Sequence, residues 1–157
     1  MFYATRATPF GPFTLVGNEQ GIVRADFQNG ARPVAIDSAW RRDDAPLREA
    51  LEALEAYCAG EPQRFAFHYN LRGTPFQQQV WQALLNIPQG TLSSYRELAE
   101  QLGRLNGFRA VGAAVGRNPV SLFVPCHRVV GSNGALTGYA GGLPLKEALL
   151  RHEGALR

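Results

Sequence analysis

The chain has 157 residues, of which 45% are hydrophobic and 18% are charged, enough for one domain or two small lobes with a packed core. No apolar run approaches the length of a membrane span, and the opening residues, MFYATRATPFGPF, lack the apolar stretch and cleavage site of a secretory signal. We therefore expect a cytoplasmic protein without a membrane partner, in which Cys58 and Cys126 are free thiols.

Charge is distributed unevenly along the chain. Residues 1–70 carry seven Arg and nine Asp or Glu, whereas residues 71–157 carry nine Arg or Lys and four Glu, so the two parts have net charges of −2 and +5. A basic second half is typical of a lobe that meets a polyanion. So small an excess is also compatible with a solvated basic surface that has no partner, and charge alone leaves both interpretations open.

The first quarter of the chain predicts a small antiparallel sheet. Short, partly alternating apolar runs are separated by turn-forming segments, and these runs are residues 2–7, 13–17 and 21–27. They predict a β-meander or hairpins. Residues 31–45 mix Pro with charged side chains and predict a loop.

A helix and a further strand complete the predicted first lobe. Residues 46–60 predict a helix that ends at Gly60, with Cys58 on its apolar face as a core residue. Residues 65–71 predict a strand. We place the domain boundary after this strand, which gives an N-terminal α/β lobe at 1–72 and a C-terminal domain at 73–157.

The second half predicts mainly helices. Four segments have helical periodicity or helix start and stop signals, at 74–87, 94–103, 107–119 and 143–154. Thr74 with Gln77, and Ser94 with Glu97, have the spacing of a capping box. The fold class is therefore α+β, with a mainly helical second lobe and a short strand near the candidate site.

The helices at 94–103 and 107–119 resemble a helix-turn-helix. The second is unusually rich in small residues, namely Ala110, Gly112, Ala113, Ala114 and Gly116. Small residues let a helix backbone approach another surface closely, and that surface can be a packed helix or a nucleic-acid groove. Arg109, at the start of this helix, suits the narrow minor groove.

The stretch SLFVPCHRVVGSNG contains the most reactive residue pair, Cys126 and His127, at the end of an apolar run that predicts a buried strand. No pair of Cys and His residues has a metal-ligand spacing, so we expect no metal site. The thiol is either a nucleophile or a core residue. As a nucleophile it would use His127 as base, through a water if the backbone is extended, with Glu153, Glu147 or Glu97 to orient the histidine.

Five segments together resemble the O6-alkylguanine-DNA alkyltransferases, also called methylated-DNA–protein-cysteine methyltransferases. They are TPFQQQVWQAL, IPQGTLSSYRELA, RAVGAAVGRNPV, PCHRVVG and TGYAGGLPLKEALLRHEG, and they cover residues 74–154 in order. Residues 1–70 are only loosely similar, through TPFGPFTLVG. The resemblance implies a DNA repair enzyme that binds double-stranded DNA through the minor groove and flips out an O6-alkylated guanine. O4-alkylthymine is a second candidate substrate.

The resemblance implies a role for individual residues. Cys126 would accept the alkyl group irreversibly, His127 would be the base through a water, and Glu153 would orient His127. Asn118 would hold the turn around the site, and Tyr95 would donate a proton toward the purine. Arg109 would fill the gap in the base stack, while the other DNA contacts would be Ala110, Gly112, Ser94, Arg96 and Ser132. The guanine pocket would be lined by Val129, Tyr139 and Ala140. No cofactor would be needed, and the protein would be a monomer that clusters on DNA.

The chain departs from the family pattern at GRLNGFRAV, where many relatives have GRPGAARAV, so residues Leu105–Phe108 can alter how the helix meets DNA. Two other functions stay open. One is a lesion-binding relative without transfer activity, which the presence of Cys126 disfavours. The other is a thiol hydrolase using Cys126, His127 and Glu153, which would lack an obvious oxyanion hole.

Overall fold

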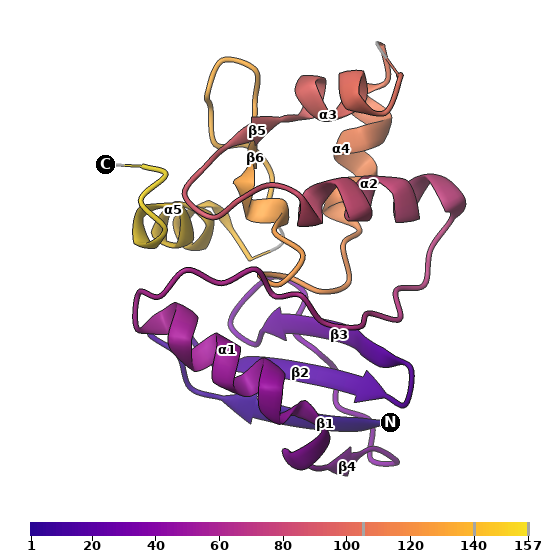
Figure 1. Ribbon diagram of the computed structural model, residues 1–157, viewed down its shortest axis with the longest axis vertical. Helices are drawn as coiled ribbons and strands as arrows, with labels where there is room; N and C mark the ends of the chain where they lie inside the picture. The colour runs from indigo at the N-terminus through magenta and orange to yellow at the C-terminus, as the bar shows by residue number, and fades with distance from the viewer. Residues whose placement is uncertain (105, 140, 157) are drawn as a thin grey trace.

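The structure is a computed structural model that describes residues 1–104, 106–139 and 141–156. Two lobes lie one above the other in Figure 1, a sheet-containing N-terminal lobe and a mainly helical C-terminal lobe. One continuous hydrophobic core joins residues of both lobes, from Ala4 to Leu149. No helix in the described part of the chain is long and apolar enough to span a membrane.

The N-terminal sheet has four strands in the order β3-β2-β1-β4. The first three are the expected antiparallel strands, at β1 (Phe2–Arg6), β2 (Phe13–Asn18) and β3 (Gly21–Phe27). The fourth, β4 (Arg41–Arg42), pairs in parallel with β1, so the expected loop at 31–45 contains a short edge strand and the sheet is mixed. Its two Arg side chains are exposed, and charged side chains on an edge strand disfavour pairing with a strand of another molecule.

Helix α1 (Arg48–Cys58) covers this sheet, after the 3-10 turn η1 (Ala45–Leu47). The strand expected at residues 65–71 is wrong, because this segment is an irregular linker with one isolated bridge between Ile22 and Tyr69. Phe65 has a φ of 50°, which takes it out of extended geometry and breaks the strand pattern.

The C-terminal lobe contains the four expected helices. They are α2 (Pro75–Leu85), α3 (Tyr95–Gln101), α4 (Phe108–Gly116) and α5 (Leu143–His152). Between them, β5 (Ser93–Ser94) and β6 (Val129–Val130) form a parallel pair. Helices α3 and α4 pack on each other in the order expected of a helix-turn-helix (Figure 1).

One of the two expected capping boxes is complete. At α2 the Thr74 hydroxyl accepts from the Gln77 amide, and the Gln77 side chain accepts from the Thr74 amide. At α3 the Ser94 hydroxyl accepts from the Glu97 amide as expected, but the Glu97 carboxylate accepts from the hydroxyl of Ser93 instead of returning to Ser94. The second box is therefore only half formed.

The two lobes are joined at the free edge of β3. The amide of Ala25 donates to Pro119 (3.0 Å), and the amide of Ser121 donates to Ala25 (2.9 Å). The Phe123 ring then stacks on Phe65, with centroids 4.2 Å apart, and on Phe13, at 5.8 Å. The N-terminal sheet and the linker therefore hold the segment that leads to Cys126.

Candidate active site

Cys126 begins a 3-10 turn, η2 (Cys126–Arg128), directly before β6. The apolar run before it is a turn with Leu122 at a φ of 72°, so the expected buried strand is wrong. An apolar side chain in this left-handed region is strained and needs its surroundings to hold it. Here the backbone bonds from Phe123 to Ser121 and from Val124 to Val120 close the turn.

The thiol faces a cavity of about 310 Å³ between the lobes. Cys126 is 8% exposed, so it is buried yet reachable from this cavity. The other walls come from the loop after β3, from α3 and α4, and from the segment before α5, and the lining residues include Arg32, Tyr95, Gly112, Asn118, Ser121 and Tyr139. A cavity of this size is at the lower end of the range for small-molecule sites.

His127 is fully buried and is paired with Glu153 at the end of α5, with 2.6 Å between Nε2 and Oε2. The same carboxylate also accepts from Arg128 Nε (2.8 Å) and from the Tyr57 hydroxyl (2.7 Å). Burial by itself would raise the pKa of Glu153, but the hydrogen bonds from His127 and Arg128 and the charge of Arg128 outweigh it and hold this pKa at about 2. Glu153, among the three expected candidates, is therefore the carboxylate that meets His127.

The partners of His127 define its tautomer. Because Glu153 is ionised, Nε2 must carry the proton that it shares with the carboxylate. Burial lowers the pKa of His127, so the ring is neutral at pH 7 and Nδ1 has a free lone pair. Nδ1 is buried without a hydrogen-bond partner among the described residues, so it is the nitrogen available as a base.

The surroundings of the Cys126 thiol shift its pKa in opposite directions. Burial has the largest effect and raises the pKa, while the Asn118 side chain and the ammonium group of Lys146 lower it in part. The net direction is upward, so the thiol stays protonated at neutral pH and needs a base to become a thiolate. This requirement matches the free Nδ1 of the adjacent histidine.

The side-chain amide of Asn118 joins the end of α4 to the turn that precedes Cys126. Its Nδ2 donates to the carbonyl of Val124 (2.7 Å), and its Oδ1 accepts from the amide of Val120 (3.0 Å). The side chain is buried, so both bonds are shielded from water. They fix the distance between α4 and the thiol segment.

Helix α4 buries one face and exposes the other. Val111, Ala114 and Val115 are buried, whereas Arg109 and Ala110 are exposed. Gly112 lies against the Tyr95 ring, where an added Cβ would be 3.6 Å from the nearest ring carbon. One face of α4 therefore packs on α2 and α3, and the other carries small side chains and Arg109 at the surface.

The other residues expected to meet DNA have different surroundings. Arg96 is exposed and its guanidinium lies over the Phe108 ring, 5.3 Å from the centroid. Ser132 is exposed in the turn after β6. Ser94 is buried and its hydroxyl caps α3, so its side chain already has a structural role.

The expected guanine-pocket residues are only partly described. Tyr139 lines the cavity, and its hydroxyl is buried with no hydrogen-bond partner among the described residues. Val129 is buried in β6 and is not among the described residues that line this cavity. Ala140 and Leu105 lie outside the described residues.

Sequence reasoning missed two residues that border the site. Arg32, in the loop after β3, lines the cavity and donates to the Gly116 carbonyl at the end of α4. Lys146, the single lysine, is fully buried and donates to the carbonyls of Val129 (2.5 Å) and Thr137 (2.8 Å). Lys146 shares the buried face of α5 with Leu149 and Leu150, a pattern visible in the sequence, whereas nothing in the sequence near Arg32 signals its position.

Fold and site together define a two-lobed protein with a buried thiol–histidine–carboxylate set beside a helix-turn-helix. Residues 1–71 match the family model of the 6-O-methylguanine DNA methyltransferase ribonuclease-like domain, and residues 75–155 match that of the DNA binding domain. The chain therefore belongs to the 6-O-methylguanine DNA methyltransferase family.

Individual relatives resemble the chain along nearly all of its length. The methylated-DNA–protein-cysteine methyltransferase of Methanosarcina acetivorans is 44% identical over 155 residues, covering 99% of each chain. The crystal structure of Mycobacterium tuberculosis OGT in complex with DNA has a TM-score of 0.89 at 42% identity, covering 99% of this chain and 94% of that one. The crystal structure of the O6-methylguanine-DNA methyltransferase from Pyrococcus kodakaraensis has a TM-score of 0.64 at 27% identity, with 98% of each chain covered.

Proposed function

We propose that this protein repairs double-stranded DNA by transferring the alkyl group of O6-alkylguanine to Cys126, once per molecule. The observation that carries the proposal is the buried Cys126 thiol, which borders a cavity and stands next to a histidine with one free ring nitrogen. Family membership and a DNA-bound relative of similar structure support the same reaction. We assign DNA binding and transfer to residues 73–157, and support of the thiol segment to residues 1–72.

The proposed reaction begins with activation of the thiol. His127 Nδ1 takes the Cys126 proton through a water, and Glu153 stabilises the imidazolium that forms. The new thiolate attacks the alkyl carbon of a guanine held in the cavity. The S–C bond forms as the C–O6 bond breaks, and the electron pair of that bond passes to O6. The purine then takes up a proton, for which we propose the Tyr95 hydroxyl as donor, since burial raises its pKa and keeps it protonated.

The proposed DNA interface is the exposed face of α4. With a small residue at Ala110, the backbone can approach the floor of the minor groove, and Arg109 is long enough to occupy the space of an extruded base. Arg96 and Ser132 are exposed on the same lobe and are candidates for phosphate contacts. Such binding would weaken with salt because phosphate contacts release counterions.

A transfer assay with a matched pair of cysteine variants tests the proposal. The protein is mixed with a short duplex that contains one O6-methylguanine, and peptides are analysed by mass spectrometry. We expect one added methyl group on the Cys126 peptide, restored guanine, and no second turnover. Cys126→Ser should abolish transfer, and Cys58→Ser should retain it, because Cys58 lies on α1 and does not line the cavity.

The outcomes separate this proposal from the two other functions. Lesion binding without a mass change would indicate a damage-sensing protein. Multiple turnover of an ester by the wild type, lost in Cys126→Ser, would indicate a hydrolase. Either result would contradict the proposed single-use transfer.

A further inference from the structure

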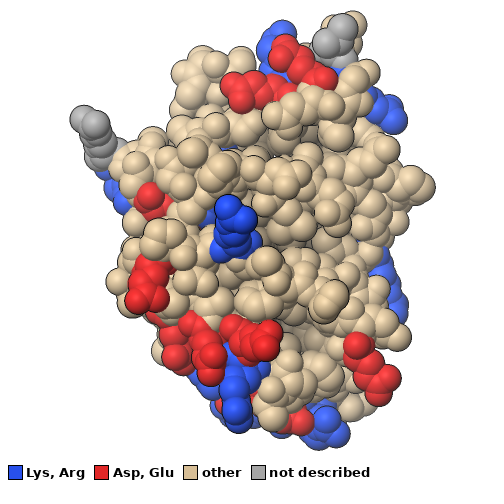
Figure 2. Space-filling view, viewed as in Figure 1, with Lys and Arg blue, Asp and Glu red and all other residues tan. Residues whose placement is uncertain are grey.

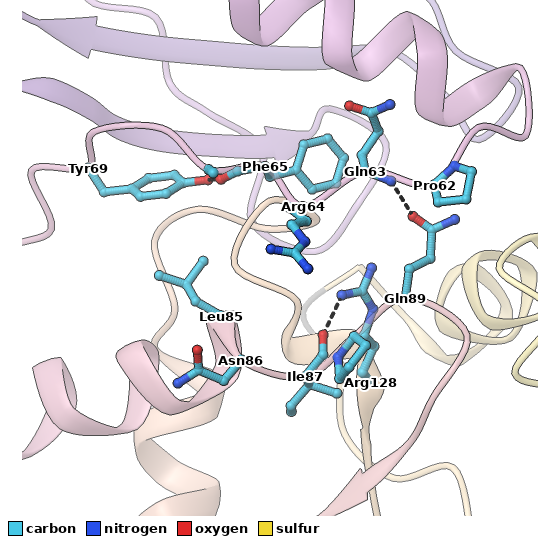
Figure 3. A pocket seen from close by; sticks show the side chains of 12 residues that line it. Pro62, Gln63, Arg64, Phe65, Tyr69, Leu85, Asn86, Ile87, Gln89 and Arg128 are labelled. Carbon is cyan, nitrogen blue, oxygen red and sulfur yellow. Dashed lines mark hydrogen bonds between the residues drawn. The ribbon is translucent and has the colours of Figure 1, made fainter.

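A second cavity, of about 720 Å³, lies where the linker between the lobes passes over the turn that follows α2 (Figure 3). Gln63 and Arg64 of the linker form one wall, and Asn86 and Gln89 form the opposite one. Arg128 lines the same cavity, whereas Cys126 does not. The amide of Gln63 donates to Gln89 Oε1 (3.0 Å), and this bond holds the two walls together.

Arg128 presents a fixed, unused donor to this cavity. Its Nε is bonded to Glu153 (2.8 Å) and its Nη1 to the carbonyl of Ile87 (2.7 Å), so the guanidinium cannot rotate away. The side chain is 4% exposed, and Nη2 is buried with no acceptor among the described residues. Because a buried guanidinium N–H without an acceptor is costly, its position calls for a partner that the described residues do not supply.

Arg64 adds a second positive charge to the same space. In Figure 3 its guanidinium points from the linker into the cavity, toward the side from which Arg128 enters. No Asp or Glu is among the lining residues, whereas three amide side chains are, namely Gln63, Asn86 and Gln89. On the face drawn in Figure 2, acidic side chains gather mainly over the N-terminal lobe and near the far end of the C-terminal lobe.

We propose that this cavity binds a small molecule through an oxyanion, a phosphate or carboxylate group held between the guanidinium groups of Arg64 and Arg128. Planar guanidinium groups bind such groups through paired, charge-assisted hydrogen bonds. The amide side chains can donate to the remaining oxygens, and the volume suits a small organic ligand. This site is separate from the Cys126 cavity and does not depend on the proposed function.

The test is thermal unfolding of the full chain with inorganic phosphate or acetate, at constant ionic strength set with NaCl. Saturable binding should raise the melting temperature by about 3–6 °C at ten times the dissociation constant. Arg64→Ala should weaken binding at least tenfold. Arg72→Ala, which changes an exposed arginine of the same linker outside the cavity, should bind as the wild type does.

The two anions distinguish the ligand classes within the proposal. A saturable effect of phosphate alone indicates a phosphate-bearing ligand, and an effect of acetate indicates a carboxylate. A melting temperature that rises without saturation, or a saturable effect that Arg64→Ala leaves unchanged, would overturn the proposal, because the anion would then act on the solvent or bind elsewhere.

Discussion

The substitution Glu153→Gln removes the charge that organises the site while keeping the shape of the side chain. The carboxylate accepts from His127, Arg128 and Tyr57, and its side chain is fully buried. Gln would leave the buried Arg128 cation without its counter-ion. Breaking a buried pair in this way costs about 3–5 kcal/mol.

The pKa of Glu153 gives a second estimate of the unfolding free energy that its charge contributes. The folded value of about 2 is below the ordinary 4.5, a difference worth about 3 kcal/mol. Because the folded pKa is depressed, this stability is present above pH 4.5 and is lost as the pH falls toward 2. The difference in unfolding free energy between wild type and Glu153→Gln should therefore shrink by about 2 kcal/mol between pH 6 and pH 3.

Urea unfolding at a series of pH values measures both the loss of unfolding free energy in Glu153→Gln and its dependence on pH. Glu147→Gln is the matched control, since Glu147 lies on α5 and forms an exposed ion pair with Arg151, worth less than about 0.5 kcal/mol. The reasoning is refuted if the two variants lose similar stability at pH 7, or if the loss in Glu153→Gln is independent of pH. Transfer by Glu153→Gln should also slow, because the imidazolium form of His127 loses its stabilising anion.

Three further substitutions test the supports of the site and its DNA face. Phe123→Ala should cost about 3–5 kcal/mol in urea unfolding, while Phe108→Ala, at an exposed ring, should change it by less than about 0.5 kcal/mol. Asn118→Ala should cost about 2–4 kcal/mol, because it leaves two buried backbone groups unpaired, and should slow transfer. Arg109→Ala should keep wild-type stability but slow transfer from duplex DNA at least tenfold. Arg117→Ala, which changes another exposed arginine, should transfer at the wild-type rate. Equal transfer rates of the two variants would contradict the role of Arg109 in filling the base stack.

Helix positions were predictable because their signals are local. Thr74 and Gln77 mark the start of α2 through backbone contacts three residues apart, and the structure has both bonds. Only half of the capping box predicted at α3 forms, because the Glu97 carboxylate accepts from the Ser93 hydroxyl instead. The spacing of Ser94 and Glu97 does not reveal this competing donor. The expected strand at 65–71 failed for a similar reason, since an alternating pattern does not reveal that Phe65 leaves the extended region.

Contacts between the lobes lay beyond sequence reasoning. The residue types near Cys126 indicated a nucleophile or a core thiol, and the resemblance selected Glu153 from three possible carboxylates. Nothing local indicated that Arg32 would line the same cavity, because its place depends on how the loop after β3 crosses to the end of α4. The backbone turn at Leu122 depends in the same way on bonds to a distant strand.

The join between the lobes explains how the N-terminal lobe contributes to the site. A strained turn at Leu122 stores free energy that only its surroundings can offset. Those surroundings are the edge of β3, which pairs with the turn through Ala25, and the rings of Phe13 and Phe65, which hold Phe123. The N-terminal lobe therefore acts as the rigid support against which the thiol segment is folded.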